Sequence, residues 1–149
     1  MPTELGAGQI AHAIQLAIAP VFLLTGIAAM LGVMATRLAR VIDRARAVET
    51  GWSALSEGAR TAAREELAIL ERRRRVCSWS INYCTAAALA VCVVIVTLFA
   101  DEMLATDLKW TEGILFVLAM FLLIGGLTCF LREVYLATHT IQFDSARLD

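Results

Sequence analysis

The chain has 149 residues, of which 59% are hydrophobic and 18% charged, and a formal net charge of -1 at pH 7. An ordinary soluble domain is about 45–50% apolar, so the composition argues against that class. The surplus is gathered in three blocks without Asp, Glu, Lys or Arg, at 10–35, 81–100 and 113–131. Each block has about the 20 residues that a helix needs to cross the hydrocarbon core of a bilayer. We therefore predict an all-α integral membrane protein with three transmembrane helices.

The first predicted helix begins near Ile10, crosses the membrane to about residue 36, and continues without a break to about Val48. Pro20 lies inside this span, where it removes one backbone hydrogen bond and is expected to kink the helix. Beyond Arg37 the apolar residues continue at steps of three and four, which predicts packing against another helix in water. This apolar seam consists of Leu38, Val41/Ile42, Ala45 and Val48.

The segment 37–76 is predicted to form a cytoplasmic antiparallel helical hairpin between the first and second spans. Its tip is the turn-rich stretch "ETGWSALSEG", and its second arm runs over about 59–76. The second arm has its own predicted seam, at alternating steps of four and three residues. That seam consists of Ala63, Leu67, Leu70, Arg74 and Cys77.

The second and third spans are predicted at about 79–100 and 113–131, and a cytoplasmic extension of the third helix at about 132–143. Arg132 follows the third span and is expected to reach toward the lipid headgroups or to pair with an acid such as Asp43. Residues 1–149 are treated as a single membrane domain, because no linker or internal repeat is visible.

The basic residues are distributed very unevenly along the chain. Ten of the thirteen lie between the first and second apolar blocks, from Arg37 to Arg75. Because arginine resists translocation, this connection should be cytoplasmic, which leaves the N-terminus outside and the C-terminus inside. Glu4, rather than a basic segment, precedes the first block, so we interpret that block as a retained span and not as a signal peptide.

One face of the first helix carries the polar residues of the span. On a helical wheel, the residues of this face lie within about 40° of Gln15, except His12, which lies about 60° away. The face is polar at its outer end, apolar in the middle and positively charged at its inner end. A polar stripe in lipid is costly and should face protein or water. We interpret it as the lining of a pore with a hydrophobic constriction near Phe22 and a positive cytoplasmic vestibule. Alternatively, Gln15 bonds to another helix of the same subunit and the arginines are ordinary topology anchors. The candidate pore-lining residues are His12, Gln15, Ala19, Phe22, Gly26, Val33, Arg37, Arg40 and Arg44.

Small residues predict where helices approach each other closely. A small-xxx-small pattern follows the inner half of the first helix, and two adjacent glycines lie in the third span. The candidate packing residues are Thr25, Ala28, Gly32, Thr36, Gly125 and Gly126. Three thin helices bury little surface alone, so we expect a homo-oligomer. The consecutive arginines Arg72, Arg73, Arg74 and Arg75 are expected to contact anionic lipid headgroups.

The sequence shows no phosphate-binding loop, nucleophile–base pair or metal-ligand spacing. We therefore expect neither an enzyme nor a cofactor, and the glutamates interleaved with the arginines argue against nucleic-acid binding. The cysteines are expected to be small packing residues. The leading hypothesis is a small homo-oligomeric ion channel lined by the first helix. The alternatives are a non-conducting membrane scaffold or signalling protein whose hairpin binds a partner and, more remotely, a protein that handles lipid or quinone.

Two stretches of this sequence, "APVFLLTGI" and "RLARVIDRAR", together with "FLREVYLATHTI" near the end, resemble a known family. The chain is similar over most of its length to small bacterial three-helix membrane proteins classed as a domain of unknown function, DUF2721. The resemblance implies three membrane helices and no assigned activity. We expect the protein to lie in the bacterial inner membrane. In that family an Asn commonly precedes the first arginine of the second motif, whereas this chain has Thr36.

Overall fold

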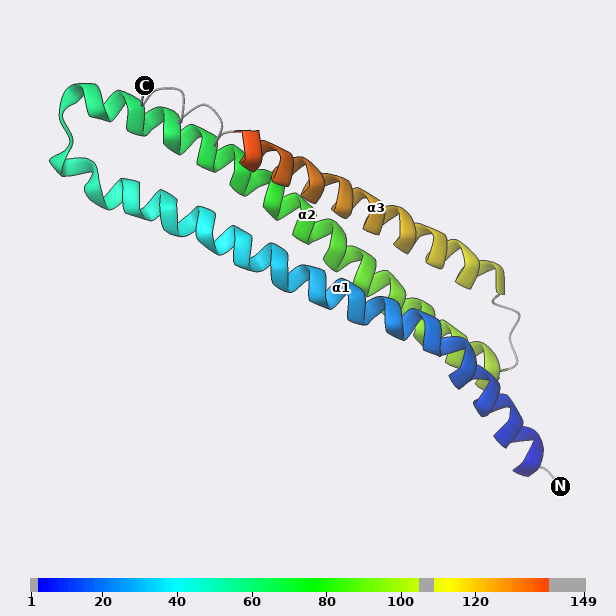
Figure 1. The fold of residues 1–149 in the computed structure, drawn as a ribbon. Helices are drawn as coiled ribbons and strands as arrows, with labels where there is room; N and C mark the ends of the chain where they lie inside the picture. The colour runs from blue at the N-terminus through cyan, green and yellow to red at the C-terminus, as the bar shows by residue number, and fades with distance from the viewer. Residues whose placement is uncertain (1–2, 105–108, 140–149) are drawn as a thin grey trace. The chain divides into compact units, whose positions relative to one another are not determined.

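The structure, a computed structural model, describes residues 3–104 and 109–139, with side chains for 11–104 and 109–135. It consists of α1 (Thr3–Gly51), a short 3-10 helix η1 (Trp52–Ala54), α2 (Glu57–Leu104) and α3 (Lys109–His139), as Figure 1 shows. The prediction of an all-α chain is confirmed over the described residues. Three helices are long and apolar enough to cross a membrane. The predicted extension of the third helix reaches His139, and positions 140–143 lie outside the described residues.

Helix α1 joins the apolar and the arginine-rich parts of the sequence in one element. It has 49 residues and continues through Pro20, which is buried. At 1.5 Å per residue this helix is about 74 Å long, more than twice the roughly 30 Å of a hydrocarbon core. A large part of α1 therefore has to stand outside the lipid if α1 spans a bilayer.

The chain divides into two compact units. The first comprises Met1–Leu31 with Tyr83–Ile124. Its core combines small residues with larger apolar ones. The buried small residues are Ala13, Ala17, Cys84, Ala87 and Ala119, and the buried larger ones are Ile27, Val91, Val94 and Leu123. Other large apolar side chains point outward, which a monomer in water would rarely tolerate over so much surface. The most exposed include Phe22, Val96 and Phe121.

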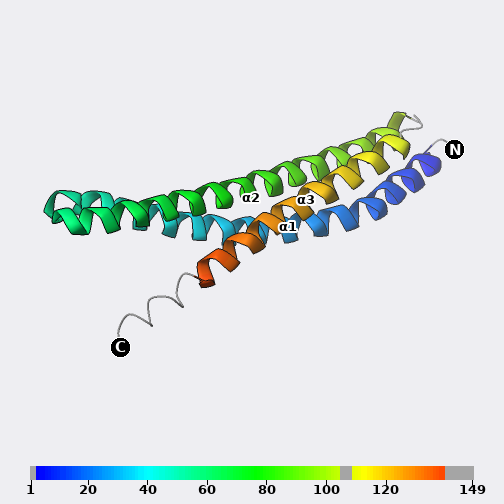
Figure 2. The ribbon, with the colours of Figure 1, turned by 90° about the horizontal axis from the view of Figure 1, so that it is seen from above.

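The second unit comprises Gly32–Asn82 with Gly125–Asp149. Figures 1 and 2 show the later part of α1 and the earlier part of α2 lying side by side in this unit, joined through η1. The Leu55 amide donates to the Trp52 carbonyl oxygen at 3.3 Å in the turn. On α1, Val41 is buried and Leu38, Ala45 and Val48 are half-buried, as the predicted seam requires.

On α2 the predicted seam is correct at Ala63, Leu70 and Cys77 but wrong at Arg74, which is exposed. Arg73 is half-buried in its place. The reason is a seven-residue repeat of buried or half-buried residues along α2. It starts in the apolar half of the helix and runs back toward the N-terminus through positions 94, 87, 80, 73 and 66. A strict seven-residue repeat keeps one face of a helix toward its neighbours. The packed face of the charged half of α2 therefore continues the packed face of its apolar half, and this face includes position 73 and not position 74.

The packed face of α1 also repeats every seven residues, at 13, 20, 27, 34 and 41. An undistorted helix drifts about 20° per heptad relative to such a repeat. A stripe drawn on a straight helical wheel therefore moves around the helix relative to the packed face. At Gln15 the predicted polar stripe lies on the side of α1 opposite the packed face. Arg37 and Arg44 instead lie beside the packed face, because they follow the buried residues Met34 and Val41 by three positions.

Candidate functional site

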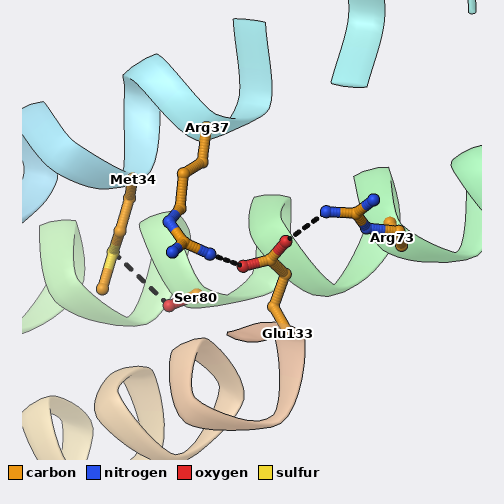
Figure 3. Close-up of polar contacts among 5 residues, drawn as sticks. All are labelled: Met34, Arg37, Arg73, Ser80 and Glu133. Atoms are coloured by element: carbon orange, nitrogen blue, oxygen red, sulfur yellow. Dashed lines mark hydrogen bonds and ion pairs between the residues drawn. The ribbon is translucent and has the colours of Figure 1, made fainter. Parts of the chain in front are cut away.

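A buried glutamate lies between two arginines in the second unit. Glu133 of α3 is 1% exposed, and its two carboxylate oxygens accept hydrogen bonds from different helices. Arg37 of α1 donates from Nη1 at 2.8 Å, and Arg73 of α2 donates from Nη2 at 3.0 Å. Figure 3 shows the two guanidinium groups approaching the carboxylate from opposite sides. This charge cluster, Arg37–Glu133–Arg73, joins all three helices.

Glu133 is buried because of its position along α3. It follows Ala119 and Gly126, both buried, at two successive steps of seven residues, so it lies on the packed face of the helix. Burying a carboxylate costs several kcal/mol unless it is paired. The side chains of Arg37 and Arg73 are 38% and 26% exposed and keep part of their hydration. The carboxylate therefore bears most of the desolvation, and the two arginines compensate for it.

Further contacts restrict the two arginines. The guanidinium of Arg37 lies 5.4 Å from the centroid of the Phe130 ring, close enough for a cation–π interaction that orients it. Arg73 Nε is buried and has no hydrogen-bond partner among the described residues. An unsatisfied buried donor costs about 1–3 kcal/mol. Arg73 thus carries an unused donor beside the cluster.

Ser80 supplies a second polar contact between helices. It is completely buried on α2, and its Oγ lies 2.7 Å from the Gly126 carbonyl oxygen and 3.4 Å from Sδ of Met34. A hydroxyl has one proton, so Ser80 donates to the nearer carbonyl while the sulfur contacts its other side. Figure 3 shows the contact between Ser80 and Met34 next to the charge cluster. The residues at positions 66, 73 and 80 of the α2 repeat are all polar, and each bonds to another helix.

A half-open cavity of about 230 Å³ adjoins the charge cluster. Its lining contains four arginines and a single acid, Glu133; the residues are Arg37, Arg40, Val41, Arg44, Leu70, Arg73 and Glu133. Arg44 Nε donates to Glu66 at 2.7 Å, and this pair is well exposed. The hydrogen bond and the charge of Glu66 raise the pKa of Arg44. Arg40 is exposed and makes no ion pair with any described residue.

The predicted pore stripe is exposed in the protomer except at Arg37, which is half-buried. Its apolar and outer members lie on the exposed face of α1, whereas Arg37 and Arg44 turn to acids within the protomer. Arg40, which lies between them in the sequence, makes no ion pair with a described residue. The exposed members are His12, Gln15, Ala19, Phe22, Gly26, Val33, Arg40 and Arg44. The charge of the predicted vestibule is thus partly neutralised inside each protomer.

The predicted packing residues of α1 do not pack within the protomer. Thr25, Ala28, Gly32 and Thr36 are all exposed, and a Cβ placed on Gly32 would have no neighbour within 4 Å. The Thr25 and Thr36 hydroxyls donate to carbonyls of their own helix at 3.3 and 2.9 Å. On α3, Gly125 is half-buried and Gly126 is buried. The small-residue face of α1 is therefore uncovered.

The arginine run at 72–75 is divided by the packing of α2. Arg72, Arg74 and Arg75 are exposed, whereas Arg73 turns inward to Glu133. Arg132 is exposed and makes no ion pair with a described residue, so the alternative that it pairs with Asp43 is wrong, and its reach toward the lipid headgroups stays a prediction. The neighbouring Glu133 is the residue that pairs.

The sequence contained a signal for Glu133 that its interpretation missed. Glu133 lies at the end of an apolar helix and on the same face as its small packed residues. An acid at such a position is buried and therefore needs a positively charged partner. The same reasoning applies to Ser80, seven residues before Ala87 on α2. Among the described residues, no group of three or more His, Cys, Asp or Glu could hold a metal ion. All four cysteines are free thiols, and Cys77 and Cys84 are buried.

The three long apolar helices and their outward-facing phenylalanines and valines define a multi-pass helical membrane protein. The chain matches the model of the family described as Protein of unknown function (DUF2721) over residues 17–143. It belongs to this family, as its sequence motifs indicated. No curated protein and no solved structure matches the chain.

Proposed function

We propose that this protein is a homo-oligomeric ion channel of the bacterial inner membrane, lined by α1, with its N-terminus outside and its C-terminus in the cytoplasm. The proposed orientation follows from the ten basic residues between the first and second apolar blocks. The segments of α1 and α2 in the second unit would then form the cytoplasmic hairpin. The proposal includes no enzymatic activity, cofactor or nucleic-acid partner.

One observation carries the proposal: the face of α1 with the polar stripe is uncovered in the protomer. Gln15 is exposed in the apolar part of the helix, and Phe22 is 73% exposed. A polar residue at such a position needs protein or water as a neighbour. Next to this stripe, Ala28, Gly32 and Thr36 offer a small-residue surface on which a second copy can pack. A ring of protomers would satisfy both requirements at once.

The charge cluster modifies the predicted vestibule. Arg37 and Arg44 are paired with Glu133 and Glu66, so the unpaired positive charge along the inner part of the stripe comes from Arg40. One such charge per protomer would favour anions near the inner mouth. The strength of this preference would depend on the number of subunits.

Reconstitution tests the channel. Purified protein in planar bilayers should conduct, and Phe22→Ser should change the unitary conductance, because a polar group relieves a constriction that gates by dewetting. Phe121→Ser is the matched control, since Phe121 is also strongly exposed but lies on α3. Silent bilayers for the wild type and for Phe22→Ser would refute the channel.

The orientation is tested separately. A cysteine at Trp52, in a chain whose four native cysteines are replaced by alanine, should react with a membrane-impermeant maleimide only after the cells are opened. Trp52 lies in η1 and is half-buried, so the reagent can reach it. Labelling from outside intact cells would reverse the topology and contradict the proposal.

A second candidate, a non-conducting scaffold, is favoured by a surface near η1. A shallow groove of about 340 Å³ lies there, lined mainly by small residues that include Ala47, Ala59, Ala62 and Ala63. A partner helix could lie in such a groove. If Ala62→Arg abolished a site-specific crosslink to a partner protein while Phe22→Ser had no effect on any property, the scaffold would replace the channel.

A further inference from the structure

We propose that the cavity beside the charge cluster binds a phosphate group carrying two negative charges. The cavity lies entirely within the second unit, between α1 and α2 and next to Glu133 of α3. This inference does not depend on conduction, because the site is built inside one protomer and not around a symmetry axis.

The charges that line the cavity are out of balance. Four guanidinium groups face one carboxylate, and including Glu66, which pairs with Arg44, still leaves two positive charges in excess. A phosphate monoester carries about −1.5 to −2 charges at pH 7, which matches this excess. A chloride ion or a single carboxylate would leave the cavity positive.

Unused donors accompany the unused charge. Arg40 is exposed and makes no ion pair with any described residue, so its guanidinium is available to a ligand. Arg37 uses one guanidinium nitrogen for Glu133, out of five N–H donors. Guanidinium groups bind tetrahedral oxyanions through two parallel hydrogen bonds, which favours phosphate over spherical anions.

Glu133 holds the site open. Its two oxygens bind Arg37 and Arg73 from opposite sides, which holds these two guanidinium groups apart although their charges repel each other. The cation–π contact with Phe130 restricts Arg37 further. The arginines are thus positioned before a ligand arrives, which lowers the entropic cost of binding.

The phosphate could belong to a soluble compound or to a lipid headgroup, and two measurements distinguish these sources. Equilibrium dialysis of the full chain in a neutral detergent uses radiolabelled inorganic phosphate. In the second measurement, the protein is placed in nanodiscs of phosphatidylcholine and phosphatidic acid. Native mass spectrometry then counts the acidic lipids that each protomer retains. Saturable binding in either measurement supports the site and identifies the source of the phosphate.

Arg40→Gln is the decisive variant, because Arg40 lines the cavity without supporting the charge cluster. Loss of a charge-assisted contact should weaken binding roughly tenfold, while Arg40→Lys should retain part of the affinity. Arg46→Gln removes the same charge from an exposed position of α1 outside the cavity lining and should leave binding unchanged. Absence of saturable binding in both measurements, or equal weakening by Arg40→Gln and Arg46→Gln, would overturn the proposal.

Discussion

Arg37 and Glu133 are 96 positions apart in the sequence, yet the arginine Nη1 lies 2.8 Å from a carboxylate oxygen that has almost no contact with solvent. This bond joins the first helix to the third, and Arg73 joins the second helix to the same carboxylate. Removing the charges of this cluster in different ways should therefore have unequal effects on stability.

The double variant Arg37→Met/Arg73→Met should be less stable than Glu133→Leu. The double variant leaves a buried carboxylate without a cation, which costs about 3–5 kcal/mol. Glu133→Leu removes the buried charge and leaves two arginines that reach solvent. The melting temperatures of the variants in one detergent test this order. A lower melting temperature for Glu133→Leu would show that the arginines, not the glutamate, are the costly partners.

Arg44 and Arg37 lie seven residues apart on the same side of α1, and each binds an acid. Arg44→Ala should hardly change the melting temperature, because its pair with Glu66 is well exposed and such pairs contribute little to stability. Arg37→Ala should lower it clearly, since Glu133 is buried. Equal losses for the two variants would mean that burial of the acid does not determine the strength of these pairs.

Ser80→Leu should destabilise the protein strongly, because its bulk would separate α2 from α3 at Gly126 and remove the 2.7 Å hydrogen bond. Overpacking of this kind costs about 1–3 kcal/mol, and the lost bond about 1 kcal/mol more. Ser78→Leu is the matched control, since Ser78 is exposed on the same helix. Thermal unfolding of both variants makes the comparison, and similar melting temperatures would contradict the described packing at Ser80.

Gly32→Leu should reduce self-association without destabilising the protomer. No atom lies within 4 Å of a Cβ at this position, and leucine is the better helix former. Chemical crosslinking in membranes, followed by electrophoresis, measures the oligomer yield. Gly113→Leu, equally unobstructed but on α3, serves as the control. An unchanged oligomer yield for Gly32→Leu would remove this face from the proposed interface.

Local features of the sequence were sufficient to predict the helices. The three uncharged blocks each lie within one of the long helices, and the seam residues Val41 and Leu70 are buried as their spacing indicated. The side chains of the site were harder to predict. A helical wheel at 100° per residue ignores the heptad drift, so it placed Arg37 with Gln15. Arg74 was placed on the seam by alternating steps of four and three residues, whereas Arg73 is the half-buried residue and Arg74 is exposed. The pairing of Arg37 with Glu133 depends on which helices meet, and no local pattern records that.

Because Arg37 and Glu133 are far apart in the sequence, they are synthesised at different times. Chains emerge from the ribosome at about 5–20 residues per second, so Arg37 and Arg73 exist for seconds before the acid that they later share. During that interval their charges are not neutralised by Glu133. Once the last helix arrives, the same charges fasten it to the two helices already in place.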